Sequence, residues 1–323
     1  MLDKYGRNIN YLRVSITDRC NLRCKYCMPD ELPFIPHGDI LRYEEILQIC
    51  KAAAALGINA IKVTGGEPLA RKGCVDFIKD LKALPGIQAV TLTTNGVLLE
   101  PYIEELAQAG LDGINISLDT LNPENYKKIT GRDEFAKVWS ALQQTIKSPL
   151  YAKLNFVPIK GINDKEIVPF ARLAEELPIH IRFIELMPTS LAGGFSGVPS
   201  EEALFAIKSE FKDLAPEGKK LGNGPARYYK SERLLGSIGF IDAISNHFCS
   251  ECNRLRLTSE GFLKLCLYHN DGIDLRSMLR SGASEDGIRR AIEDAVLRKP
   301  EKHDFGNEKS ADEGLRRMSR IGG

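Results

Sequence analysis

Three cysteines in one short segment have the spacing of an iron–sulfur site. Cys20, Cys24 and Cys27 follow the pattern C-x3-C-x2-C. Thiolates from one loop can hold three irons of a [4Fe–4S] cluster, for which a full set of protein ligands would be four cysteines. The fourth iron would then be open to another molecule. A zinc site or disulfides are the alternatives for the same residues, and the motifs farther along the chain favour a cluster.

A second group of three cysteines lies nearer the other end of the chain. Cys249, Cys252 and Cys266 follow the pattern C-x2-C-x13-C. Zinc normally takes four ligands, and His247 or His269 could complete such a site, so zinc stays open as an alternative. We interpret the group as a second cluster with one open iron, which could anchor a substrate.

Basic residues occur at strand positions where a cation is expensive to bury. Arg254 and Arg256 alternate on a predicted strand and therefore share one face. Arg13, Lys62 and Lys153 lie on other predicted strands. Burying such charges costs free energy unless an anion meets them. The pattern predicts a strongly anionic guest such as a triphosphate, whereas a solvated basic strand is the alternative for the two arginines.

Strand-like and helix-like segments alternate from Tyr11 to about Met187, which predicts parallel βα units. The predicted strands are 11–17, 58–64, 88–93, 112–118, 151–158 and 179–187. The predicted helices lie near 43–56, 73–84, 101–109, 134–147 and 164–176. Six units are too few for a closed eight-stranded barrel, so the predicted fold is α/β, an incomplete (βα)6 barrel.

Polar or glycine-rich residues follow most of these predicted strands. Because the carboxyl ends of parallel strands meet at one edge, we expect them to form a site there. The segments concerned are 20–27, 64–68, 93–96, 117–119 and 185–188.

The composition changes after Met187, and we predict two regions. Residues 1–215 would form the barrel, and residues 216–323 a C-terminal α+β extension that carries the second cysteine group and a tail covering the barrel mouth. In the later part of the chain we expect strands near 226–230, 234–240, 254–258 and 262–267, and helices near 200–211, 273–280 and 284–298.

The composition excludes several classes of protein. The chain has 323 residues and a net charge of +1, so no global basic field attracts nucleic acid or a membrane. We see no signal peptide and no apolar run of about 20 residues, the length that spans a membrane. We therefore expect a cytoplasmic protein. Cys50 and Cys74 lie outside both groups and are expected to be core or near-surface thiols.

Six features together resemble the GTP 3′,8-cyclase family, the radical S-adenosylmethionine (SAM) enzymes that open molybdenum cofactor biosynthesis. The resemblance covers nearly the whole chain, and the second cysteine group and the final glycine pair are its most specific parts. The features are 17–21, 65–68, 92–96, 182–185, 248–256 and Gly322-Gly323.

The resemblance implies two [4Fe–4S] clusters, SAM and GTP, with a role for each matched residue. Cys20, Cys24 and Cys27 would hold the cluster that binds SAM, and Cys249, Cys252 and Cys266 the cluster that meets the guanine. SAM would contact Tyr26, Gly66, Ser117 and Met187. GTP would contact Arg13, Lys62, Thr93, Lys153, Arg254, Leu255 and Arg256. The final glycines would thread into the active site.

The implied activity is closure of GTP to (8S)-3′,8-cyclo-7,8-dihydroguanosine 5′-triphosphate, started by the 5′-deoxyadenosyl radical from SAM. No side chain need act as acid or base in the first step. An external one-electron reductant is expected, with functional hand-over to cyclic pyranopterin monophosphate synthase. The sequence leaves the oligomeric state open, a homodimer included. The alternatives are a radical-SAM enzyme acting on a peptide and a zinc-binding nucleic-acid module.

Overall fold

The computed structural model describes residues 1–28, 34–187, 194–219 and 221–303. Its first six strands run parallel and pair in chain order. All six lie where the sequence predicted them. They are β1 (Tyr11–Ser15), β2 (Ala60–Thr64), β3 (Ala89–Thr94), β4 (Gly113–Ser117), β5 (Ala152–Phe156) and β6 (His180–Ile184).

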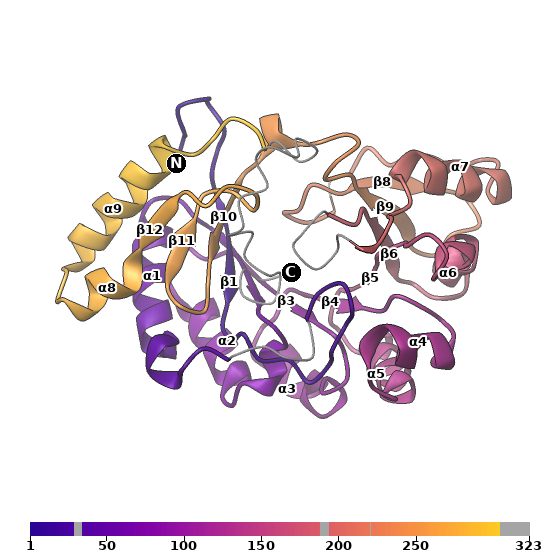
Figure 1. The fold of residues 1–323 in the computed structure, drawn as a ribbon, viewed down its shortest axis with the longest axis horizontal. Helices are drawn as coiled ribbons and strands as arrows, with labels where there is room; N and C mark the ends of the chain where they lie inside the picture. The colour runs from indigo at the N-terminus through magenta and orange to yellow at the C-terminus, as the bar shows by residue number, and fades with distance from the viewer. Residues whose placement is uncertain (29–33, 188–193, 220, 304–323) are drawn as a thin grey trace.

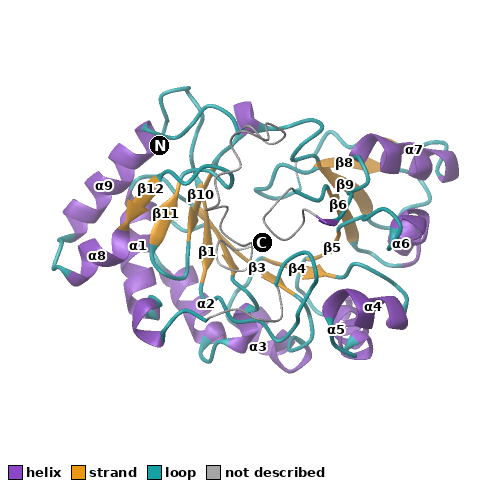
Figure 2. Cartoon of the chain, viewed as in Figure 1, coloured by secondary structure: helices purple, strands orange, loops and turns teal. Residues whose placement is uncertain are grey.

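Helices connect these strands and confirm the predicted alternation. They cover the outer, convex side of the curved sheet (Figure 2). In chain order they are α1 (Tyr43–Ala55), α2 (Cys74–Ala83), α3 (Ile103–Gln108), α4 (Pro123–Thr130), α5 (Phe135–Lys147) and α6 (Ile167–Glu176). The prediction missed α4, which begins with the Asn122 side chain accepting a hydrogen bond from the Asn125 N–H at 3.0 Å.

The C-terminal region extends the same sheet at both edges. β10 (Arg254–Leu257) pairs parallel with β1, and β9 (Ser237–Ile241) pairs parallel with β6. Antiparallel strands then continue outward to an edge on each side, so the sheet stays open (Figure 1). These outer strands are β11 (Phe262–Lys264) and β12 (Gly272–Asp274) beyond β10, and β8 (Arg227–Lys230) and β7 (Ala215–Pro216) beyond β9.

Three helices complete the C-terminal part. They are α7 (Ser200–Glu210), α8 (Leu275–Arg280) and α9 (Glu285–Leu297), close to their predicted positions. The boundary expected at 215/216 falls within β7. Gly322-Gly323, Pro188 and Gly193 lie outside the described residues. No helix in the described ranges is both long and apolar enough to cross a bilayer.

Alternation along each strand separates two environments. Leu12 and Val14, for example, pack in the hydrophobic core with the helices, whereas Arg13 between them belongs to the opposite face of the sheet. The same alternation places Lys62 between Ile61 and Val63, both of which are core residues. The concave interior of the barrel therefore receives the polar half of each strand.

Candidate active site

The first cysteine loop follows β1 at the carboxyl edge of the barrel. A turn links its last two cysteines, because the Cys24 carbonyl accepts hydrogen bonds from the N–H groups of Cys27 and Met28 at 2.9 and 2.8 Å. The loop also pairs with the end of α4, where the Arg23 N–H donates to the Thr130 carbonyl at 2.8 Å. The helix that the prediction missed therefore supports the loop.

The three thiols have the chemistry and the surroundings of cluster ligands. The Cys20 sulfur accepts hydrogen bonds from the Leu22 N–H at 3.4 Å and from Asn95 Nδ2 at 3.5 Å. Burial, followed by the neighbouring Cys20 and Asp119, raises the pKa of Cys27 to about 12. Burial also raises the pKa of Cys24, with Cys27, Asp119 and Cys20 adding to the effect. The thiols are therefore close enough to affect one another, and binding of a metal must displace their protons.

The thiol positions suit a cluster better than a single ion. Within the described part of the chain, no three His, Cys, Asp or Glu side chains are grouped as ligands of one metal ion. In a four-iron cluster each thiolate binds a different iron, so the sulfurs need not converge on one point. The residues present fit a [4Fe–4S] cluster.

The glycine pair after β2 allows two pieces of backbone to meet. A Cβ on Gly66 would lie 2.3 Å from the Arg19 carbonyl oxygen, and one on Gly65 would lie 2.7 Å from that of Thr17. The N–H of Gly66 donates to the Thr17 carbonyl at 2.7 Å. The structure shows that the glycines admit the start of the cysteine loop, while the expected contact of Gly66 with a ligand stays a prediction.

Glu67 joins this turn to the end of β3. Its side chain is fully buried and accepts hydrogen bonds from Thr94 Oγ1 at 2.8 Å and from the Asn95 N–H at 2.8 Å. Burial raises its pKa to about 7. Because Asn95 in turn contacts Cys20, Glu67 positions a cysteine that it does not touch.

Asp119, just beyond β4, fixes the residue that precedes Cys27. Its carboxylate accepts hydrogen bonds from the Tyr26 hydroxyl and from the Val157 N–H, the latter at 2.9 Å. Burial raises the pKa of Asp119 to about 6. Ser117 ends β4, and Met187 follows β6 at the same edge; both residues are partly exposed. The four residues expected to contact SAM therefore share one rim with the cysteine loop.

The second cysteine group lies at the opposite edge of the barrel. Cys249 and Cys252 precede β10, whose first residue Arg254 is level with Tyr11, the first residue of β1. Cys266 returns to this edge because β11 runs antiparallel to β10. All three thiols are free and partly exposed.

The length of β1 sets the spacing between the two groups. Its five residues span roughly 13 Å at about 3.3 Å per residue. The space between the groups is the concave interior of the barrel.

Buried cations line this interior. Arg13 is level with Lys62 on one side and with Arg256 on the other. Lys62 is 8% exposed, and burial lowers its pKa well below the usual value, followed by the charges of Arg182, Arg13 and Lys153. Among the described residues, no carboxylate forms an ion pair with Lys62, Lys153 or Arg182. The cations therefore repel one another until an anion arrives.

Arg182 on β6 is a member of this cluster that was not assigned a role from the sequence. It is 8% exposed, and its guanidinium donates to Asn115 Oδ1. Its Nε and the buried Asn155 Oδ1 have no hydrogen-bond partner in the described part of the chain. Arg182 alternates with the core residues Ile181 and Phe183, so the strand-face argument used for Arg13 would have found it.

Thr93 and Leu255, two further predicted GTP contacts, differ in whether their side chains face the barrel interior. Thr93 Oγ1 accepts a hydrogen bond from Asn115 Nδ2 at 3.4 Å and is partly exposed. The Leu255 side chain is 1% exposed and packs in the hydrophobic core, on the face opposite to Arg254 and Arg256. A contact from Leu255 would therefore have to come from its backbone.

A loop from the linker lies against the amino edge. Lys153 Nζ donates to the Leu221 carbonyl at 2.5 Å, and Asn253 Nδ2 donates to the Asn223 carbonyl at 3.4 Å. His269, by contrast, bonds the Lys302 carbonyl at 3.0 Å through Nε2, and His247 is exposed with its ring 5.3 Å from that of His303. Within the ranges that the structure describes, neither histidine is grouped with two further metal-binding side chains as a zinc site would require.

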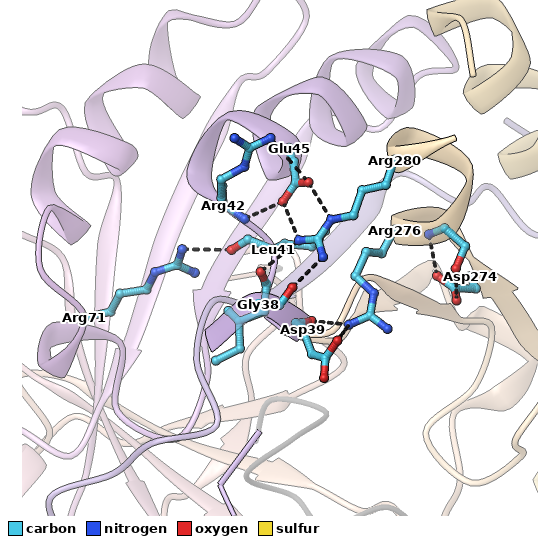
Figure 3. A network of polar contacts seen from close by, with 11 residues as sticks. Gly38, Asp39, Leu41, Arg42, Glu45, Arg71, Asp274, Arg276 and Arg280 are labelled. Atoms are coloured by element: carbon cyan, nitrogen blue, oxygen red, sulfur yellow. Dashed lines mark hydrogen bonds and ion pairs between the residues drawn. The ribbon is translucent and has the colours of Figure 1, made fainter. Parts of the chain in front are cut away.

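Polar contacts fix the segment that follows the first cysteine loop (Figure 3). Glu45 accepts hydrogen bonds from the Arg42 N–H and from Arg280 of α8 at 2.7 and 2.9 Å. Arg276 of α8 pairs with Asp39 at 3.1 Å. The C-terminal region therefore helps to fix the start of α1 and the residues just before it, although its own cysteines lie at the other edge.

Removing one interior cation should stabilise the ligand-free protein. Lys62→Met replaces a buried ammonium with an apolar side chain of similar length, and we expect the free energy of unfolding to rise by about 1–4 kcal/mol without GTP. The added stability that GTP confers should fall at the same time. Urea denaturation with and without GTP measures both quantities. The exposed Lys79→Met is the control, and a loss of stability in Lys62→Met alone would contradict a repulsive cluster.

Relatives match this arrangement over the whole chain. A protein of Moorella thermoacetica named GTP 3′,8-cyclase is 47% identical over 330 residues, and one of Desulforamulus reducens with the same name is 45% identical over 330 residues. Both alignments cover 100% of each chain. The chain belongs to the GTP 3′,8-cyclase family.

Two family models match successive parts of the chain. The Radical SAM superfamily matches residues 14–174, which include the end of β1, strands β2 to β5 and the first cysteine loop. Molybdenum Cofactor Synthesis C matches residues 179–305, which include β9, β10 and the second cysteine group. Membership of the superfamily implies one [4Fe–4S] cluster and SAM as cofactors.

Solved structures agree on the fold of this GTP 3′,8-cyclase family member. Streptococcus suis SuiB bound to S-adenosylmethionine superimposes with a TM-score of 0.65 over 92% of this chain and 73% of that one. The identity is 12%, so the likeness concerns the fold alone. The relatives do not favour the peptide-modifying or nucleic-acid alternatives.

Proposed function

We propose that this chain cyclises GTP to (8S)-3′,8-cyclo-7,8-dihydroguanosine 5′-triphosphate, the first step of molybdenum cofactor biosynthesis. The full-length relatives named for that activity support the proposal. The observation that carries it is the cation cluster between the two cysteine groups. A triphosphate would supply negative charge to Lys62, Lys153 and Arg182 through charge-assisted hydrogen bonds, since no carboxylate among the described residues forms an ion pair with these three.

The first cluster would be held by Cys20, Cys24 and Cys27, with SAM against Tyr26, Gly66, Ser117 and Met187. When bound, the cluster and SAM supply the radical that removes the 3′ hydrogen of the ribose. The task of the chain is placement. Asn95 and Asp119 hold the loop, and the barrel wall keeps water away from the reacting atoms.

The second cluster would be held by Cys249, Cys252 and Cys266, and its open iron would meet the guanine. Arg13, Lys62, Lys153, Arg182, Arg254 and Arg256 would grip the triphosphate, with Thr93 and the Leu255 backbone beside it. Opposite ends of β1 would thus hold the radical source and the nucleotide base.

The setting of the reaction follows from its chemistry. An external one-electron reductant is required, and the product would pass to cyclic pyranopterin monophosphate synthase. All eight cysteines are free, which supports a reducing compartment such as the cytoplasm. The proposal includes a homodimer, for which the single chain of the structure describes no interface.

The test is the anaerobically reconstituted enzyme supplied with SAM, a reductant and GTP. We expect mass analysis to find a product of the same mass as GTP but with different retention, formed together with 5′-deoxyadenosine. Formation of 5′-deoxyadenosine without GTP conversion would keep the superfamily and contradict the substrate.

GTP affinity should fall as the pH rises above neutrality. Burial, followed by the charge of Arg182, lowers the pKa of Lys153 to about 7. A bound triphosphate favours the ammonium, so binding above pH 7 must take up a proton. The stability of the GTP-free protein should change in the opposite direction. Its free energy of unfolding should rise as the pH increases from about 7, the pKa of Lys153 in the folded protein, toward 10.5, the unfolded value, because the folded protein then no longer buries an ammonium.

Calorimetry in buffers of different ionisation enthalpy measures this proton uptake. Lys153→Arg is the matched variant, because a guanidinium stays charged throughout the range. We expect it to bind GTP with a flatter pH profile. An affinity of the unchanged protein that does not vary between pH 7 and 9 would show that Lys153 does not meet the triphosphate.

A further inference from the structure

Lys299 is a buried cation outside the barrel interior. It follows α9 and is 2% exposed, although lysine is almost never fully buried without a partner. Its Nζ donates to the Arg254 carbonyl at 3.0 Å and to the Leu265 carbonyl. Two of the three donors of its ammonium are therefore used by the backbone.

Both carbonyls lie beside cysteines of the second group, one in β10 and the other directly after β11. Arg254 lies two residues after Cys252, and Leu265 directly precedes Cys266. Lys299 thus joins the two chain segments that must hold their thiolates at fixed positions. No carboxylate in the described residues forms an ion pair with Lys299.

The charge of Lys299 acts on the cysteines instead. Lys299 interacts electrostatically with both Cys252 and Cys266, the cysteines beside its two carbonyl partners. As thiolates, these two residues would compensate the buried ammonium.

Arg7 is a second cation beside the same cysteine group and provides a contrast. It donates to the carbonyls of Cys249 at 2.9 Å and of Pro300 at 2.7 Å. Its charge, however, is neutralised by Asp3 at 2.6 Å. Arg7 therefore fixes backbone segments with its charge balanced by Asp3, whereas Lys299 has no carboxylate beside it among the described residues.

We propose that Lys299 is a positioning residue that offsets the thiolate charge of the second centre and raises its reduction potential. The inference rests on the proposed second cluster. Reduction adds negative charge to a buried group that already carries three thiolates, and a nearby cation makes that addition less costly.

The experiment uses the full chain with Cys20, Cys24 and Cys27 replaced by alanine, so that only the second cluster can form. Iron and sulfide analysis comes first, because absence of both would refute the second cluster itself and not the role of Lys299. EPR-monitored redox titration then compares Lys299→Met, Lys299→Arg and the exposed control Lys302→Met.

At a fixed potential we expect Lys299→Met to lower the ratio of reduced to oxidised cluster by about tenfold, or about 59 mV for one electron. Lys299→Arg and Lys302→Met should stay near the parent. If Lys299→Met assembles no cluster while Lys299→Arg does, the required positive charge is also supported. An unchanged potential in Lys299→Met, or loss of the cluster from both folded Lys299 variants, would overturn the proposal in favour of a purely structural role.

Discussion

Cys24→Ala is expected to abolish the formation of 5′-deoxyadenosine from SAM. Cys24 is the central thiol of the first loop, and its carbonyl also closes the turn to Cys27. Loss of neighbours of metal ligands typically lowers metal affinity or activity by about 10–100-fold, so loss of a ligand should exceed that. Iron should fall from about eight to about four per chain, since only the second cluster remains.

The control for this variant is Cys50→Ala. Cys50 is fully buried in the core on α1 and belongs to neither group. It should keep both the iron content and SAM cleavage. Anaerobic assay by chromatography measures the 5′-deoxyadenosine, and its undiminished production by Cys24→Ala would refute the assignment of the first loop.

Arg256→Ala is expected to weaken GTP binding by roughly one to two orders of magnitude. The side chain is 9% exposed and is level with Arg13 across the β1–β10 pair. Each hydrogen bond to a charged group contributes about 1.5–3 kcal/mol, so loss of one guanidinium accounts for that factor. Direct binding of GTP to the reconstituted protein measures it.

Iron and sulfide should remain at the parent level in Arg256→Ala. Arg290→Ala, an exposed arginine on α9, serves as the charge-matched control. Arg254→Ala should also weaken GTP binding and leave both clusters in place, although its contact with the Cys252 sulfur calls for the iron measurement beside it. Unchanged GTP affinity in both variants would mean that the two arginines only line a strand.

Hydrophobic alternation predicted the positions of the strands and helices better than it predicted which strands pair with each other. The six barrel strands and most helices lie where the periodicity placed them. Periodicity carries no information about which distant segments pair, so the parallel contact of Arg254 with Tyr11 could not be read from it. The short helix Pro123–Thr130 was missed despite its Asn122-Pro123 start, because eight residues give few apolar repeats.

Site residues could be predicted from the sequence where the residue type and strand position alone indicate the role. They could not be predicted where the role depends on contacts between several loops. Arg13, Lys62 and Lys153 follow from charge at core-strand positions. Glu67 acts through Asn95, whose side chain meets a cysteine 75 positions away, and such a relay depends on the folded loops. The explanation of Gly66 from the sequence was incomplete because it also depends on the folded loops. A side chain at Gly66 would clash with the backbone of Arg19, which belongs to another turn.

Because cysteine groups lie beyond both ends of β1, insertions and deletions within this strand should be selected against during evolution. A one-residue insertion within Tyr11–Ser15 would turn Arg13 from the interior toward the helices, because the side-chain period is two. It would also move the first cysteine loop by about one residue's rise of 3.3 Å relative to the second group. We therefore expect length variation among homologous chains in surface connections such as 281–283, between α8 and α9, and constant length between Asn10 and Cys20.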